Sequence, residues 1–353
     1  MKNIKSENYF EQRDQINISK IRELIKYELP EFCDEFFLGI EPYTSTLTRL
    51  GYARDLKTFF QFLVKEIREF SSLDVQELTI ADLDKVTSTH IEKYLHYLSY
   101  YTNDEKKKYQ NGEKARGRKL SSVRSLLKYF FKKDKIKSNV ADKIDTPKVH
   151  EGEIIRLEVD EVVKLLNESE DSKGFSQQQK NYLKHTRERD FAIITLFLGT
   201  GIRISECVGL NIDDINFKEN AFRITRKGGN KAVLYFNDEV KDALIQWLRV
   251  RQKLKVLPYS EKALFVSLQN KRISVRAVQN LVKKYSENIT LKHITPHKLR
   301  STFGTNLYRE TNDIYMVANV LGHKDVNTTR KHYAAVGEDL KRQAASKVKL
   351  RNE

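Results

Sequence analysis

The stretch that decides the fold lies at residues 295–333. It reads Thr-Pro-His-Lys-Leu-Arg at 295–300, Leu-Gly-His at 321–323, and ends on Tyr333. Thr295 is a good helix N-cap and Pro296 a good first helical residue, so a helix is predicted to begin here. His297 and Arg300 would share one face of its first turn, near its positive end. This arrangement suits a phosphate group, but two surface residues of an ordinary helix would give the same pattern.

The rest of this stretch also has a helical pattern. Leu299, Phe303 and Leu307 are spaced by four and predict the buried side of the first helix. Asp313 is a good N-cap for a second helix. Gly322 stands where a left-handed terminator belongs, which would turn the following histidine out of the helix.

Composition limits the class of protein. The 353 residues suffice for two domains, and 64 Lys+Arg against 48 Asp+Glu give a net charge of +16 and a pI near 9.5. Such a surplus favours a polyanionic partner, nucleic acid before membrane, over a merely basic solvated surface. Two cysteines, Cys33 and Cys207, exclude a disulfide scaffold or a zinc site and fit a reducing cytoplasm. Without a long apolar run or a signal peptide, we expect a cytoplasmic protein that contacts no membrane.

Helical periodicity dominates the first part of the chain. We expect residues 1–14 to be loosely ordered and residues 15–136 to form a helical DNA-binding domain. Its helices are predicted near 19–37, 43–67, 89–101 and 120–133, with a basic loop at 102–118. The basic faces of these helices tilt the interpretation towards phosphate contacts.

A polar linker at 137–152 would lead to a second domain at 153–337, followed by a tail helix at 338–353. In the second domain we expect a helix at 157–166, a polar loop at 171–187, and a buried helix at 191–198 that ends at Gly199 and Gly201. Strands are predicted at 221–225 and 232–236, joined by a Gly-Gly hairpin turn. Further helices are predicted at 238–254 and 275–285.

Seven polar residues stand beside apolar helices and turns without an evident structural reason: Arg203, Glu206, Lys227, His297, Arg300, His323 and Tyr333. One such residue alone is more often structural, so the inference rests on the whole set. Phosphodiester transfer without a metal needs two guanidiniums on the non-bridging oxygens, an in-line nucleophile and a proton donor for the leaving oxygen. Tyrosine, with an ordinary pKa of about 10, becomes a nucleophile where cations favour its phenolate.

The ordered set resembles the tyrosine recombinase (phage integrase) superfamily, and within it the Xer recombinases. The family pattern is Arg, Lys, His-x-x-Arg, His or Trp, then Tyr, and it matches this chain at Gly201–Glu206, Arg226–Gly229, Pro296–Arg300, Leu321–His323 and Tyr333. The first domain and linker are similar to the core-binding domain of these enzymes. The resemblance implies a mainly α fold with a small β-sheet in the second domain, and a C-shaped clamp around DNA.

The resemblance also implies a role for each residue in a site-specific recombinase that needs neither metal nor cofactor. Arg203 and Arg300 would clamp the scissile phosphate, and Glu206 would support Arg203. Lys227, on its hairpin, would protonate the leaving 5′-oxygen.

The histidines and the tyrosine complete the implied mechanism. His297 would serve as general acid or base, His323 would hydrogen-bond the phosphate, and Tyr333 would form a 3′-phosphotyrosine that conserves the phosphodiester energy. Xer recombinases usually place the tyrosine nine residues after the Leu-Gly-His histidine, which here is His332. Tyr333 is the tenth, a spacing that resembles integrases of some mobile elements, and it is the only tyrosine after His323.

The implied partners are a double-stranded DNA recombination site, a homotetramer on two such sites, and a DNA translocase or directionality factor. The tail at 338–353 would contact a neighbouring protomer, and the segment at 171–187 resembles single-recombinase Xer proteins of low-GC Gram-positive bacteria. Two alternatives stay open: a type IB topoisomerase, disfavoured by the small size, and a DNA-binding protein that has lost catalysis. The sequence leaves the target DNA open, as it does the choice between chromosome-dimer resolution and mobile-element integration or excision.

Overall fold

The structure is a computed structural model that describes residues 9–102, 106–148, 155–171, 186–226, 229–323 and 325–326. The chain divides into two units, residues 1–152 and 153–353, and each is described by itself. Together they are mainly helical, with two small antiparallel sheets, as predicted. No helix among these residues combines the length and the apolar character needed to cross a bilayer.

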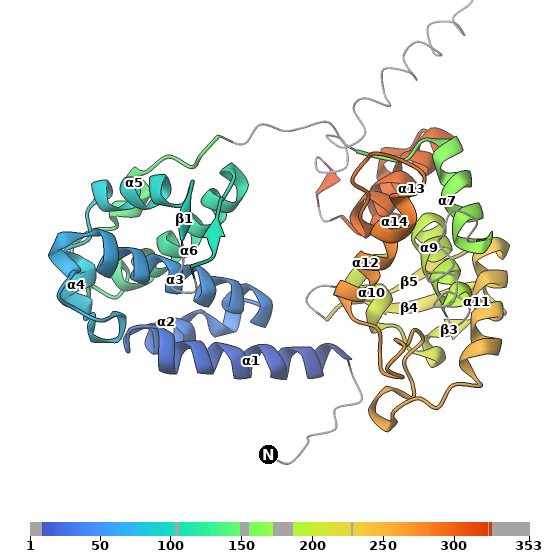
Figure 1. Cartoon of the computed structure of the whole chain (residues 1–353), viewed down its shortest axis with the longest axis horizontal. Coiled ribbons are helices and arrows are strands. Elements are labelled where there is room, and N and C mark those ends of the chain that lie inside the picture. The colour runs from blue at the N-terminus through green and yellow to red at the C-terminus, as the bar shows by residue number, and fades with distance from the viewer. Residues whose placement is uncertain are drawn as a thin grey trace, which may run out of the picture. The chain divides into compact units, whose positions relative to one another are not determined.

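The first unit is a helical domain around an aromatic core (Figure 1). Its helices are α1 (Tyr9–Glu28), α2 (Cys33–Ile40), α3 (Thr46–Glu66), α4 (Ile80–Asp84), α5 (Ser88–Tyr97) and α6 (Glu113–Phe131). The central helix is α3, which packs against α1, α5 and α6. Phe59, Phe60 and Tyr94 are fully buried there, and such rings dominate the energetics of a core.

Two predictions for the start of the chain are wrong. The helix expected at 19–37 is two helices, because Pro30 lacks an N–H and disfavours a helical conformation in the residue before it. The expectation of loose order at 1–14 fails for residues 9–14, which belong to α1. Residues 1–8 lie outside the described part of the chain.

The basic loop expected at 102–118 is also largely structured. Strands β1 (Tyr101–Thr102) and β2 (Lys108–Tyr109) pair in register, with Tyr101 opposite Tyr109. The preceding helix therefore ends at Tyr97, short of its predicted end. Helix α6 begins at Glu113, after Gly112 as its N-cap, and so includes Lys114, Arg116 and Arg118. These long side chains favour helix, so the loop predicted from their charges is wrong here.

A buried carboxylate ties α3 to α6. Asp55 is 1 % exposed and accepts hydrogen bonds from both terminal nitrogens of Arg118, 2.7 Å for Nη2 to Oδ1. Ser122 Oγ donates to Asp55 Oδ2 at 2.9 Å, and Lys119 Nζ lies 3.7 Å from Oδ1. The carboxylate is thus compensated by charge and by hydrogen bonds, as a buried charge must be.

The second unit surrounds one buried helix. Its helices are α7 (Val159–Asp171), α9 (Arg187–Thr200), α10 (Ile204–Gly209), α11 (Asp238–Arg251), α12 (Val275–Ser286), α13 (Pro296–Thr311) and α14 (Ile314–Leu321). Helix α9 packs against α7, α11 and α13. Its apolar run is therefore buried on several sides, which confirms the predicted helix at 191–198.

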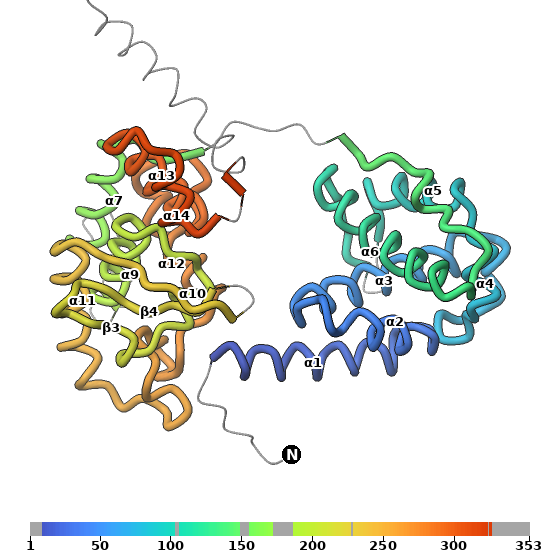
Figure 2. Tube along the Cα trace, turned by 180° about the vertical axis from the view of Figure 1, so that it is seen from behind, coloured from blue at the N-terminus to red at the C-terminus, as the bar shows by residue number. Residues whose placement is uncertain are grey.

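A three-stranded antiparallel sheet lies beside these helices (Figure 2). Its order is β3 (Ile215–Asn216), β4 (Ala221–Thr225) and β5 (Lys231–Tyr235), so both predicted strands are confirmed and a short third one is added. The register of β4 and β5 places Thr225 opposite Lys231, at the hairpin end. The hairpin thus projects from a fixed base, which positions the site described next.

Candidate active site

The predicted helix start at Thr295 is confirmed. The Thr295 side chain accepts a hydrogen bond from Lys298 N–H, and Pro296 is the first residue of α13. Leu299 is fully buried, but Arg300 is buried as well, with only 5 % of its surface exposed, whereas His297 is exposed. The shared face expected for His297 and Arg300 therefore divides into an outer histidine and an inner arginine. Arg300 Nη1 donates to Gly201 O, and Nη2 donates to Leu321 O.

A tight turn delivers Arg203 to the same place. Gly201 caps the C-terminus of α9 with φ +61°, where a Cβ would lie 2.4 Å from Phe303 Cδ1, so both the conformation and the close approach require glycine. Glu206, 3 % exposed, accepts the backbone N–H of Arg203 at Oε2 and Arg203 Nη1 at Oε1, both at 2.9 Å. This carboxylate orients the guanidinium, and Arg203 Nη2 then donates to Gly322 O at 2.9 Å.

The C-terminal end of α14 accepts hydrogen bonds from these arginines. Gly322 adopts φ +63°, and the N–H of His323 donates to Ala318 O at 2.9 Å, which gives the predicted left-handed terminator. The last carbonyls of a helix have no partner inside it and carry its negative end. Three arginines from separate segments donate to three consecutive carbonyls: Arg226 to Val320, Arg300 to Leu321 and Arg203 to Gly322. His323 follows directly, half-buried.

Arg226 also contacts this turn, although it stands in the predicted motif only as the neighbour of Lys227. It lies at the base of the β4–β5 hairpin, where its N–H donates to Asn230 O at 2.7 Å. Its Nη2 lies 3.3 Å from Val320 O. The only signal in the sequence was its position directly before Lys227. Lys227 and Tyr333 lie outside the described residues. Of the other five predicted site residues, Arg203, Glu206 and Arg300 meet at the turn directly before His323, whereas His297 lies on α13 with an exposed side chain.

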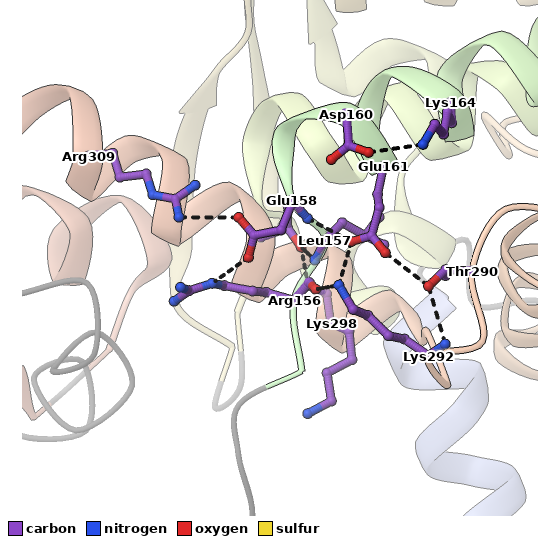
Figure 3. Close-up of polar contacts among 11 residues, drawn as sticks. Arg156, Leu157, Glu158, Asp160, Glu161, Lys164, Thr290, Lys292, Lys298 and Arg309 are labelled. Atoms are coloured by element: carbon purple, nitrogen blue, oxygen red, sulfur yellow. Dashed lines mark hydrogen bonds and ion pairs between the residues drawn. The ribbon is translucent and has the colours of Figure 1, made fainter. Parts of the chain in front are cut away.

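The first residues of the second unit brace α13 (Figure 3). Leu157 N–H donates to Thr302 Oγ1 at 3.0 Å, and Arg309 Nη2 lies 3.3 Å from Glu158 Oε2. Glu161 pairs with Lys292 and accepts from Thr290 Oγ1 at 2.9 Å. Thr302 and Arg309 both lie on α13, the helix that also supplies His297 and Arg300. The segment that contains Leu157 and Glu158 therefore helps to fix that helix in place.

Neither cysteine resembles a nucleophile. Burial raises the pKa of the Cys33 thiol, and burial together with the neighbouring Glu206 carboxylate raises that of Cys207. Both thiols therefore stay protonated and unreactive. In the part of the chain that the structure describes, no three His, Cys, Asp or Glu side chains form a group that could hold a metal ion.

Comparisons with known proteins show the family to which the chain belongs. The sequence profile of the phage integrase family matches residues 156–339. The chain is 36 % identical to tyrosine recombinase XerC of Caldanaerobacter subterraneus subsp. tengcongensis, over 94 % of this chain and 90 % of that protein. It is 30 % identical to tyrosine recombinase XerS of Lactococcus lactis subsp. cremoris, over 90 % of this chain and 96 % of that protein.

Solved structures share the fold. A XerH site-specific recombinase bound to palindromic difH substrate, in a post-cleavage complex, aligns with a TM-score of 0.60 at 20 % identity, over 85 % of this chain and 80 % of that one. A lambda integrase dimer bound to a COC′ core site aligns with a TM-score of 0.59 at 15 % identity, over 85 % and 75 %. The chain belongs to the phage integrase family and is a tyrosine site-specific recombinase with Xer recombinases among its relatives.

Proposed function

We propose that this protein cleaves and rejoins DNA strands at a recombination site through a 3′-phosphotyrosine intermediate. The Tyr333 phenol gives its proton to a general base, for which His297 is the candidate, and its oxygen attacks the scissile phosphorus. The bond from phosphorus to the 5′-oxygen breaks, and Lys227 gives that oxygen a proton. A free 5′-hydroxyl later attacks the phosphotyrosine and restores the phosphodiester. Because the covalent intermediate conserves the bond energy, the cycle needs neither ATP nor a metal.

The observation that carries this proposal is the meeting of Arg203 and Arg300 at the end of α14. Both guanidiniums donate to adjacent carbonyls, of Gly322 and Leu321, directly before His323. Two planar cations this close would bind the non-bridging oxygens of one phosphate and offset the charge of the pentacoordinate transition state. Glu206 would keep Arg203 oriented, and the exposed His297 would serve as general acid or base.

The first unit would act as the core-binding domain and the tail at 338–353 as a contact with a neighbouring protomer. Helices α3 and α6 present exposed cations that suit the phosphate backbone: Arg54, Lys65, Lys114, Arg118 and Lys128. Both named structural neighbours were solved with DNA sites. We infer a homotetramer on two double-stranded sites, with both units of each protomer contacting the DNA.

The relatives named XerC and XerS favour an Xer-like role. Chromosome-dimer resolution and excision or integration of a mobile element use the same chemistry. The Tyr333 spacing fits the second and the relatives fit the first, so the genomic position of the footprinted site would distinguish them. A DNA translocase or a directionality factor would then act as the accessory partner.

A nicked suicide duplex carrying the footprinted site tests the chemistry. Cleavage beside the nick releases a short strand that diffuses away, so the enzyme should accumulate as a denaturation-resistant adduct with DNA. Tyr333→Phe should abolish the adduct while leaving DNA binding intact. An adduct that persists in Tyr333→Phe and disappears in His332→Ala would contradict the assignment of the nucleophile. Binding without any adduct in the wild-type protein would contradict the proposed chemistry.

A further inference from the structure

Arg226 joins two parts of the candidate active site that are far apart in the sequence. Its backbone closes the hairpin, because its N–H donates to Asn230 O at 2.7 Å and its carbonyl accepts from Gly229 N–H at 3.1 Å. Its side chain leaves the hairpin and donates to Val320 O, 94 residues further along the chain. One residue therefore holds both the base of the hairpin and the end of α14.

The side chain of Arg226 is packed closely against the turn at Gly322. A Cβ on Gly322 would lie 2.0 Å from Arg226 Nη1 and 2.3 Å from its Cζ, so the guanidinium occupies space that only glycine leaves open. Arg226 Nε is buried and has no hydrogen-bond partner among the residues that the structure describes. The guanidinium is thus held over the turn, where the negative end of α14 attracts it.

We infer that Arg226 is a positioning residue for strand cleavage, which fixes the hairpin that carries Lys227 to the turn that carries His323. The inference rests on the proposed function, in which Lys227 protonates the leaving 5′-oxygen. A general acid must come within hydrogen-bond reach of that atom. A displacement of about 1 Å can cost on the order of 100-fold in rate. A contact made by residue 226 restrains the position of its covalent neighbour directly.

Two suicide duplexes that differ in one leaving atom test this inference. One carries the ordinary 5′-oxygen at the scissile phosphate and the other a bridging 5′-sulfur. A thiol is far more acidic than an alcohol, so a thiolate leaves without a proton donor. We expect Arg226→Ala to slow single-turnover adduct formation on the oxygen duplex by about 10–100-fold. On the sulfur duplex the variant should react at nearly the wild-type rate.

Matched variants separate positioning from other effects. Arg226→Lys, which keeps a cation long enough to reach Val320 O, should recover most of the rate on the oxygen duplex. Arg223→Ala removes an exposed arginine from β4, the strand that leads to Arg226, and should behave as wild type. Should Arg226→Ala fail to fold, Arg226→Gln carries the same comparison, because it keeps a donor but not the reach.

The inference is overturned if the arginine variants lose rate equally on both duplexes with DNA affinity unchanged, or if they lose no rate at all. Equal loss of rate on both duplexes would mean that Arg226 stabilises the phosphate, as proposed for Arg203 and Arg300, and does not position the proton donor Lys227. Failure of the proposed function would show itself differently, since the wild-type protein would then form no adduct on either duplex.

Discussion

Each unit contains a partly exposed arginine paired with a buried carboxylate. The two residues of the pair lie far apart in the sequence in the first unit and close together in the second. Asp55 of α3 accepts both terminal nitrogens of Arg118, 63 residues away in α6. Glu206 accepts one terminal nitrogen and the backbone N–H of Arg203, three residues before it. The Arg118 side chain is 56 % exposed and that of Arg203 32 %.

The difference indicates that the Asp55 pair braces the core and that the Glu206 pair positions an arginine. Asp55 accepts hydrogen bonds from both Nη atoms of Arg118 and from Ser122 Oγ, so its main effect is to join two helices of one core. Glu206 leaves Arg203 Nη2 to reach Gly322 O in another segment. The first pair should therefore matter mostly for stability and the second mostly for the rate of strand cleavage.

Replacing Asp55 by Ala should have the largest effect on stability. Lys119 is buried beside it, and burial followed by the Arg118 charge already lowers the Lys119 pKa, so loss of the anion leaves cations uncompensated. Breaking such a pair should lower the free energy of unfolding of the first unit by about 3 kcal/mol. Urea unfolding followed by far-UV circular dichroism would measure it.

Trp247, the single tryptophan, is buried in the second unit and reports that unit separately by fluorescence. The Trp247 transition should not move in Asp55→Ala. As a control, Asp145→Ala removes an exposed carboxylate of the first unit and should change the stability of the first unit by no more than about 0.5 kcal/mol. An equal loss of stability in Asp55→Ala and Asp145→Ala would show that Asp55 matters no more than a surface charge.

Gly201→Ala tests how strongly the local pair depends on its turn. The left-handed conformation and the 2.4 Å approach to Phe303 should together destabilise the second unit by about 2 kcal/mol, seen as an earlier Trp247 transition. Gly51→Ala, in the helical interior of α3 with only an ordinary contact at 3.9 Å, should instead stabilise the first unit by up to about 1 kcal/mol. Changes of the same sign in both variants would contradict this account.

Glu206→Gln should slow adduct formation on the suicide duplex by on the order of tenfold, which corresponds to about 1.4 kcal/mol. The amide keeps the shape of the side chain but loses the charge that orients Arg203. The Trp247 transition and the affinity for DNA should stay close to wild type, and Glu219→Gln, at an exposed glutamate, provides the control. A loss of stability as large as that of Asp55→Ala would make Glu206 a brace as well.

The carboxylate of Asp82, whose side chain is 13 % exposed, should give the smallest effect. The hydrogen bond from Lys85, with that from Thr79, lowers the pKa of Asp82 to about 2. A depressed folded-state pKa contributes stability above the unfolded value, which is lost as the pH falls from about 4 towards 2. Wild type should therefore melt a few degrees above Asp82→Asn at pH 5, and the difference should shrink towards pH 2 and vanish below it. A difference that does not depend on pH would refute the assignment.

The comparison of the two pairs also explains which features could be predicted from the sequence. Thr295, Gly201 and Gly322 act on the chain within a few residues, so the limits of their helices followed from local chemistry. The partner of Asp55 is set by the packing of α3 on α6, and that of Arg226 by the approach of a hairpin to α14. Neither has a local signal. Pro30 did carry a local signal, and the single helix predicted across it overlooked the break that proline imposes.

The anchored end of α14 gives the segment that follows it a fixed origin. Val320, Leu321 and Gly322 are each held by a guanidinium, and eleven residues of sequence separate Gly322 from Tyr333, which no conformation can extend beyond about 40 Å. One residue more or less changes that upper limit by about 3.5 Å, under a tenth of the whole. If Tyr333 is the nucleophile, as proposed, the additional residue before it would therefore matter through the direction in which its side chain points more than through the distance that the chain can span.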